Sequence, residues 1–261
     1  MDLKLISSKL EQLQTPQDQQ SQQKFDRSQY FWKAPLGKSQ IRFVPYVENK
    51  DNPFQEVFFH YGIGNRTMIS PINFGDKDPI VEFSKELRKT SEPENWRLAK
   101  KLEPKMRVFA PVIIRGEENK GVRFWEFGKQ VYQELLSYAA DEDYGDFTDV
   151  ISGLDMTVEV VQGNPYPQTS IRVKPKQTPL SDDNASVEKW LKEQPELFKY
   201  YKKYTYDEMK TALQDWLNPE DGGEEAGSSN DQSSKKDEGY TLNVKQKESF
   251  NEDEFDDLFK D

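Results

Sequence analysis

Six short runs rich in β-branched and aromatic residues constrain the fold of this chain more than any other feature of its sequence. All six lie between residues 39 and 175, and each has the length of a single strand. Turn residues and helical patterns separate them, which predicts a mainly β domain. The runs are SQIRFVPYV (39–47), EVFFHYGI (56–63), KMRVFAPVII (105–114), VRFWEF (122–127), DMTVEVVQ (155–162) and TSIRVKP (169–175).

Helical patterns interrupt and follow these strands. They lie at 80–89, 94–103, 129–140, 185–194 and 204–217. Short strands with hairpins and one helix between the fourth and fifth strands fit a Greek-key barrel of the OB type. We therefore predict a mainly β fold with added helices, built on an OB-fold-like Greek-key barrel. A mixed α+β sandwich is the alternative.

Both ends of the chain differ from this body in composition. Residues 1–23 pass from a short helical spacing of leucines into a Gln-rich stretch typical of a flexible linker. From residue 217 onward the chain carries five lysines against 14 acidic residues, so this tail supplies most of the net charge of −11. We expect an N-terminal segment (1–23) available for self-association, a core (24–217), and a disordered acidic tail (218–261).

The tip of the acidic tail places aromatic residues among carboxylates. Charge can steer such a segment toward a partner, and a few aromatic side chains can anchor it. The alternative is that the tail only increases solubility, although solubility would not require the three phenylalanines and one leucine at its tip. The candidate partner-binding residues are Phe250, Phe255, Asp256, Asp257, Leu258 and Phe259.

Several classes of protein are disfavoured by the sequence. No apolar run approaches the roughly 20 residues of a membrane span, and the N-terminus is too polar for a secretory signal. The chain has no cysteine and a single histidine, His60, which excludes Cys/His zinc sites. Neither a phosphate-binding P-loop nor a dinucleotide-binding glycine motif is present. We expect a cytoplasmic protein without catalysis, metal or cofactor.

The body of the chain contains one basic and aromatic window. From Ser84 to Lys129 there are 12 basic residues against seven acidic residues, interleaved with two tryptophans and three phenylalanines. Phosphates require cations and unstacked bases require flat apolar partners, so this pattern is typical of a single-strand binder. The alternative is a solvated charged face over ordinary core aromatics.

The strands 105–114 and 122–127 are joined by seven residues, which favours an antiparallel hairpin. Strand alternation places Arg107 and Phe109 on one face, and we expect Arg123 and Trp125 to share it while Phe124 joins the core. Two exposed aromatics flanked by arginines would form a stacking platform. Alternatively, the helix at 80–103 covers both rings and the arginines reach outward.

The order SQIRFVPYV, VFFHYGIG, NWRLAKKL, MRVFAPVII and GVRFWEFGKQVYQELL resembles the helix-destabilising single-stranded DNA-binding proteins of T-even bacteriophages. The resemblance covers roughly residues 30–175, and WEFGK at 125–129 is its most specific part. It implies an OB-fold core with a basic, aromatic cleft, an N-terminal segment for cooperative self-association, and an acidic C-terminal region that recruits replication proteins.

The resemblance also implies a set of DNA-binding residues, to which strand facing and charge add others. The matched positions are Arg42, Trp96, Lys100, Lys101, Phe109, Trp125, Lys129 and Tyr166. The additions are Lys105, Arg107, Arg123, Arg172 and Lys174.

The sequence departs from the family in two places. Where the family holds zinc with a His and three Cys, this chain has MISPINFGDKDPIVEF (68–83), which predicts a metal-free subdomain held by its own packing. The basic N-terminal motif is reduced to Lys4, Ser7, Ser8 and Lys9, so cooperative self-association through it is an open question.

The leading hypothesis is a protein of phage DNA replication, recombination and repair that coats single-stranded DNA without sequence preference. Its tail would recruit replication and recombination proteins and compete with DNA for the cleft. The alternative is an OB-like adaptor that binds an acidic protein partner and no nucleic acid.

Overall fold

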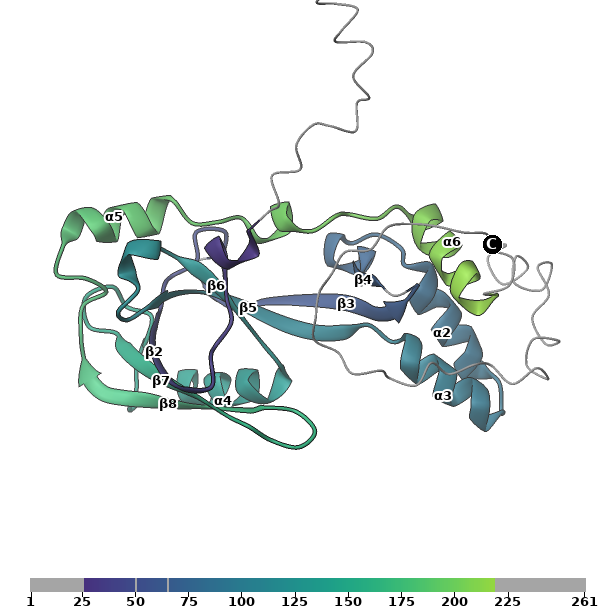
Figure 1. Ribbon diagram of the computed structural model, residues 1–261, viewed down its shortest axis with the longest axis horizontal. Helices are drawn as coiled ribbons and strands as arrows, with labels where there is room; N and C mark the ends of the chain where they lie inside the picture. The colour runs from purple at the N-terminus through teal and green to yellow at the C-terminus, as the bar shows by residue number, and fades with distance from the viewer. Residues whose placement is uncertain (1–25, 50, 65, 219–261) are drawn as a thin grey trace, which may run out of the picture.

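The computed structural model describes residues 26–49, 51–64 and 66–218. Within these ranges eight strands form one mixed sheet and five α-helices surround it (Figure 1), which confirms the expected mainly β fold with added helices. The strands are β1 (Phe31–Trp32), β2 (Gly37–Phe43), β3 (Gln55–Ile63), β4 (Arg66–Ile69), β5 (Lys105–Ile114), β6 (Arg123–Phe127), β7 (Leu154–Val161) and β8 (Gln168–Gln177). The α-helices are α2 (Pro79–Lys89), α3 (Pro93–Leu102), α4 (Lys129–Ala139), α5 (Asn184–Lys192) and α6 (Tyr206–Leu217). Short 3-10 helices are η2 (Arg27–Gln29), η3 (Pro71–Phe74), η4 (Glu118–Lys120) and η5 (Leu197–Tyr200).

The sheet follows the order β1-β6-β5-β2-β7-β8, and the β3–β4 hairpin branches from β5. Only β1 and β6 pair in parallel among these strands. The long strand β5 connects two regions because its first half pairs with β3 and its second half with β2. Beyond that junction β3 and β4 extend toward α2, α3 and α6 (Figure 1).

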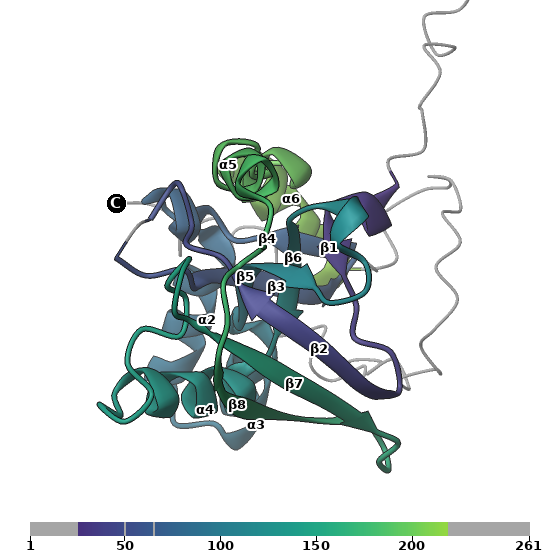
Figure 2. The same ribbon diagram turned by 90° about the vertical axis from the view of Figure 1, so that its left-hand side faces the viewer.

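The strands β2, β5, β6, β7 and β8 wrap around one apolar core, which α4 closes from one side. Ile41, Val112, Trp125, Leu135 and Met156 belong to this core and come from five different elements. Figure 2 shows α4 and α5 on opposite sides of the strands. Burial of alternating strand residues explains why the period of two in the sequence was readable.

A second core lies between the β3–β4 hairpin and the helices α2, α3 and α6. In α2 the buried residues Ile80, Phe83 and Leu87 follow helical spacing, and Asp78 caps the first turn. The helix α6 begins with a capping box between Thr205 and Glu208. The segment 68–83 therefore packs its own side chains into a core, as the sequence led us to expect.

In the β5–β6 hairpin, Trp125 lies on the face of the sheet opposite to Phe109, whereas the sequence predicted that the two rings share a face. Ala110 pairs with Trp125, and Phe109 pairs with Glu126. A shift of one residue in register moves every side chain of a strand to the other face. Trp125 therefore points into the core enclosed by β2, β5, β6, β7, β8 and α4, while Phe124 shares the face of Phe109.

The predicted exposed stacking platform is wrong, because both faces of the hairpin are covered. Trp125 is 2% exposed inside the first core, and Phe109 is fully buried in a third core on the outer face. That outer core is covered by Leu197 and Tyr201, in the segment between α5 and α6, and not by the helix at 80–103. Neither ring can stack on a base without displacing the residues that cover it.

Arg42 is also buried, which contradicts its assignment to a DNA cleft. Its guanidinium donates to the carbonyl oxygens of Asp149 at 2.6 Å and Thr178 at 2.9 Å, and lies 3.6 Å from Asp155. The Arg42 side chain has no exposed surface. It links β2 to the chain segments beside β7 and β8, which is a structural role.

A buried hydrogen-bonded cluster joins the strand β3 to α2 and α3. His60 Nε2 lies 2.9 Å from Asp78 Oδ2, and His60 Nδ1 lies 3.0 Å from the carbonyl oxygen of Leu102. The Ser70 hydroxyl also donates to Asp78 Oδ2. Asp78 Oδ1 accepts from the first backbone N–H groups of α2. The Asp78 carboxylate therefore ties β3, Ser70 and the start of α2 together, and His60 extends the cluster to α3.

The Asp78 carboxylate is expected to stabilise the fold in a pH-dependent way. Burial alone would raise its pKa, but hydrogen bonds from His60 and Ser70 outweigh burial and lower it. The stabilisation is present above the ordinary carboxyl pKa and is lost as pH falls through the lower folded-state value. We expect Asp78→Asn, which keeps the capping oxygen, to reduce the free energy of unfolding by about 1–3 kcal/mol at neutral pH. Urea unfolding should show this difference shrinking below about pH 4.

A matched control is available at the N-terminus of α5. There the exposed Asp183 accepts from the backbone N–H groups of Ala185 and Ser186. Asparagine caps a helix about as well as aspartate, so Asp183→Asn should leave the urea midpoint near its original value. Equal losses in the two variants would contradict the role of the buried cluster.

Candidate nucleic-acid interface

A groove of about 820 Å³ lies beside β1, β5 and β6, and basic side chains converge on it. We call it the cationic groove. Its basic residues are Arg27, Lys33, Arg107, Lys120 and Arg123. Its acidic residues are Glu117 and Glu126, and Phe31 and Trp32 contribute apolar surface. Five cations against two carboxylates leave the groove positively charged, which suits a polyanionic ligand.

The elements around the groove place these side chains by simple strand and turn geometry. Arg107 and Glu126 lie on one face of the β5–β6 pair, because Glu126 is opposite Phe109 and strand residues two apart share a face. Arg27 lies in η2, whose N-terminus is capped by the Asp26 side chain. Arg123 begins β6 just after Gly121, whose positive φ of 70° turns the chain into the strand.

Each carboxylate in the groove contacts two cations. Arg107 Nε donates to Glu126 Oε1 at 2.8 Å, and Arg27 Nη2 lies 3.6 Å from Glu126 Oε2. Arg123 Nη2 and Lys120 Nζ lie 2.5 Å and 3.0 Å from Glu117 Oε2. Hydrogen bonds from Arg123 and Lys120 lower the pKa of Glu117, so this carboxylate is ionised at neutral pH. The cations are thereby held in place before any ligand binds.

Aromatic side chains border the groove near Arg27. The Arg27 guanidinium lies 4.3 Å from the centre of the Phe31 ring, and Nη2 donates to the Tyr201 hydroxyl at 2.9 Å. Tyr61, on β3, is 41% exposed. Burial raises the pKa of Tyr61, Glu126 raises it further, and Arg107 and Arg27 oppose the increase. Tyr61 is an exposed ring on β3, the strand that pairs with β5, and it is not part of the groove lining.

Some of the predicted residues lie in or next to the groove. Arg107 and Arg123 line it, with 35% of the Arg107 side chain exposed but only 4% of the Arg123 side chain. Lys105 is exposed two residues before Arg107 on the same face of β5. Lys129 is exposed at the start of α4, directly after Gly128, where an added Cβ would lie 3.2 Å from Arg107 Nη1.

Three predicted residues lie on α3 in the helical region. Trp96 is 53% exposed, and the Arg88 guanidinium lies 5.2 Å from its ring centre. Lys100 and Lys101 are exposed on the same helix. A link to the groove exists through Lys105, whose Nζ lies 3.5 Å from the carbonyl oxygen of Lys100.

The remaining predicted residues lie far from Arg107 in the order of the sheet. Tyr166 is 75% exposed in the turn between β7 and β8. Arg172 and Lys174 are on β8, at the opposite end of the sheet from β1, and do not line the groove. Lys174 Nζ instead donates to Gln40 Oε1 at 2.5 Å. The candidate tail residues at 250–259 lie outside the described residues.

Sequence reasoning missed Arg27 and Lys33 as groove residues, and it included Lys120 only as one of the 12 basic residues in the window at 84–129. The stretch RSQYFWK at 27–33 interleaves basic and aromatic residues in the same way as the window at 84–129. That signal could have found Arg27 and Lys33.

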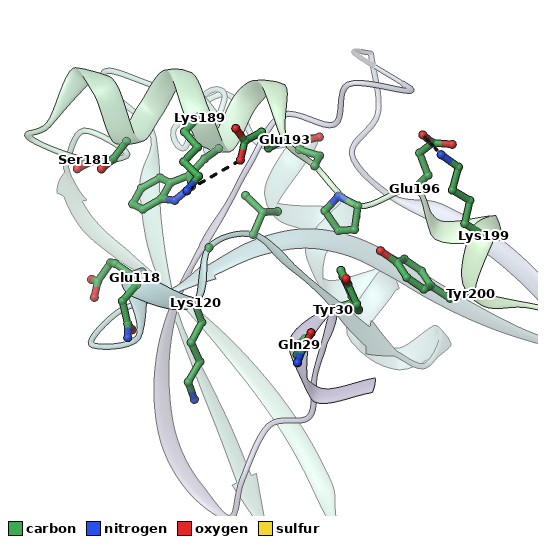
Figure 3. A pocket seen from close by; sticks show the side chains of 17 residues that line it. Gln29, Tyr30, Glu118, Lys120, Ser181, Lys189, Glu193, Glu196, Lys199 and Tyr200 are labelled. Carbon is green, nitrogen blue, oxygen red and sulfur yellow. Dashed lines mark hydrogen bonds and ion pairs between the residues drawn. The ribbon is translucent and has the colours of Figure 1, made fainter. Parts of the chain in front are cut away.

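A second hollow, of about 710 Å³, adjoins the cationic groove at Lys120. Figure 3 shows it between α5, η4 and η5, with Tyr30 and Tyr200 on its wall. Its basic residues Lys189 and Lys199 lie 3.9 Å and 2.6 Å from Glu193 and Glu196. Its three lysines are matched by three glutamates, so it lacks the positive excess of the groove.

The described ranges hold neither a candidate metal site nor a candidate membrane span. They contain no group of three or more His, Cys, Asp or Glu residues placed to hold a metal ion. No helix in the described part of the chain is long and apolar enough to cross a membrane.

The comparisons with known proteins agree with the resemblance seen in the sequence. A family model described as gp32 DNA binding protein like matches residues 36–215. No curated protein sequence matches the chain. The match spans β2 to α6 and includes Arg107, Lys120 and Arg123, and it supports a role in binding single-stranded DNA. The chain belongs to the gp32-like family of DNA-binding proteins.

Proposed function

We propose that this protein coats single-stranded DNA without sequence preference during phage DNA replication, recombination and repair, and that it performs no catalysis. We further propose that the strands around the first core form an OB-fold, and that the protein acts in the host cytoplasm at replication forks. The observation that carries the proposal is the convergence of five basic side chains on one groove of a gp32-like chain.

The groove chemistry favours the backbone of a single strand. Arginine and lysine neutralise phosphates whatever the base sequence. Each neutralised phosphate releases counter-ions from the nucleic acid, and this release makes the binding salt-dependent. An exposed ring such as Tyr61 can stack on any base, because every base has a flat face. We propose that the strand continues from Arg107 past Lys105 to Lys100, whose carbonyl oxygen lies 3.5 Å from Lys105 Nζ, and then to the exposed Trp96 on the same helix.

The test is a titration of labelled oligo(dT) followed by fluorescence anisotropy at several salt concentrations. We expect affinity to fall linearly with salt on logarithmic axes, with a slope of about −0.7 for each phosphate neutralised. Mixed-sequence single strands should bind similarly, and duplex DNA of the same length more weakly. Absence of salt-dependent binding to any single strand would favour the protein-binding adaptor instead.

The acidic tail is proposed to compete with DNA for the groove. With five lysines against 14 acidic residues, a tethered tail is a local polyanion at high effective concentration. Deleting residues 218–261 should raise DNA affinity, most of all at low salt, and should make the logarithmic salt slope steeper, because phosphates then bind cations that the tail no longer neutralises. Anisotropy titration at low salt gives the comparison, and unchanged affinity there would contradict competition.

A charge-preserving variant separates competition from partner binding. Replacing Phe250, Phe255, Leu258 and Phe259 by alanine keeps every carboxylate of the tail. DNA affinity should then stay at the full-length value. Binding to replication or recombination proteins should be lost, because their pockets would no longer receive the aromatic anchors.

A further inference from the structure

The cationic groove contains its own anion at the point where a phosphate would bind. Glu126 lies on β6 with its side chain 30% exposed, and its two carboxylate oxygens face two different arginines. One oxygen accepts from Arg107 of β5 at 2.8 Å, and the other lies 3.6 Å from Arg27 of η2. A single carboxylate therefore bridges cations from two elements across the groove.

Carboxylate and phosphate oxygens are equivalent partners for a guanidinium. Both accept charge-assisted hydrogen bonds in the same planar geometry. A phosphate that contacts Arg107 or Arg27 must therefore displace Glu126 or share the arginine with it. In either case the groove keeps one negative charge close to the DNA backbone, which opposes binding.

We propose that Glu126 is a resident counter-ion that limits both the affinity and the salt sensitivity of DNA binding in the groove. This inference rests on the proposed function and concerns its regulation. By occupying Arg107 and Arg27 when no strand is present, Glu126 competes with the phosphodiester backbone for them. It thereby speeds release of the strand and holds both arginines in the groove between binding events.

The experiment compares Glu126→Gln with the unmodified full-length protein in oligo(dT) titrations. Glutamine keeps the size of the side chain but removes its charge. We expect affinity to rise about tenfold at low salt, which corresponds to a gain of about 1.4 kcal/mol. The logarithmic salt slope should become steeper by about 0.7, because one more phosphate is neutralised.

Glu188→Gln is the matched control. Glu188 pairs with Lys192 at 3.4 Å on the exposed face of α5, and it lines neither the groove nor the second hollow. The same change of charge there should shift affinity far less. Combining Glu126→Gln with Arg107→Gln should remove most of the gain, because the released arginine is then missing.

The outcomes separate this inference from the proposed function. If the unmodified protein binds single strands in a salt-dependent way but Glu126→Gln gains no more than Glu188→Gln, the counter-ion role is wrong. If the unmodified protein shows no such binding, the proposed function itself fails. Thermal unfolding checks that each variant is folded. Glu126→Asp, which keeps the charge but shortens its reach, should give an intermediate gain if glutamine disturbs the fold.

Discussion

Asp155→Asn is expected to lower the free energy of unfolding by about 3–5 kcal/mol, because it leaves buried charge uncompensated. Asp155 Oδ1 accepts from Arg115 Nη2 at 2.8 Å and lies 3.6 Å from Arg42 Nη1. Gln40 donates to the other oxygen at 2.5 Å. Asparagine has nearly the same shape but no charge, so the buried Arg42 would lose its counter-ion. Urea unfolding followed by circular dichroism measures the loss.

Glu159→Gln on the same strand is the control for Asp155→Asn. Glu159 lies 3.7 Å from Lys38, whose side chain is largely exposed. Exposed ion pairs contribute at most about 1 kcal/mol, so this variant should unfold close to the original midpoint. If both variants lose the same stability, the buried network has no special role. A large loss of stability in Asp155→Asn alone would show that Arg42 is engaged in the buried network, where it cannot contact DNA.

Arg107→Glu is expected to weaken binding of oligo(dT) about 100-fold at low salt. Arg107 lines the groove, and its reversal would place a second carboxylate beside Glu126. The charge of the groove changes by two, so the logarithmic salt slope should become shallower by about 1.4. Fluorescence anisotropy over a salt series measures both quantities in one experiment.

Lys192→Glu is the matched charge reversal outside the groove. Lys192 is on the exposed face of α5 and pairs with Glu188 at 3.4 Å. The net charge of the protein changes by the same amount, so any general electrostatic effect appears in both variants. Equal weakening by the two substitutions would show that the strand does not bind at Arg107. Thermal unfolding of each variant confirms that the fold is retained.

The elements of this fold were readable from local patterns. The helix predicted at 80–89 corresponds to α2 and the strand predicted at 105–114 to β5. Periods of 3.6 and 2 arise from burial of one face of an element, so the sequence of that element contains them. The short strands β1 and β4 were missed, because two and four residues are too few to display a period.

Such local patterns could not predict the register of the strands or the segments that cover each face of the sheet. Trp125 and Phe124 are both buried, on opposite faces of β6, so alternation could not show which ring faces the first core. A sheet covered on both faces has no polar side to reveal its orientation. The outer cover comes from Leu197 and Tyr201, more than 70 residues later in the chain.

The sequence by itself determined the family, the secondary structure and the separation of an acidic tail from a nearly neutral body, because these depend on local order and composition. Only the tertiary structure decided which basic residues share a surface. Arg27 of η2, Arg107 of β5 and Glu126 of β6 meet because β5 and β6 pair and η2 lies against them. Arg42 is equally basic, but its side chain is fully buried and its charge is balanced by Asp155 on β7. A charge acts at a surface through its neighbours in space, and those neighbours are set by strand pairing.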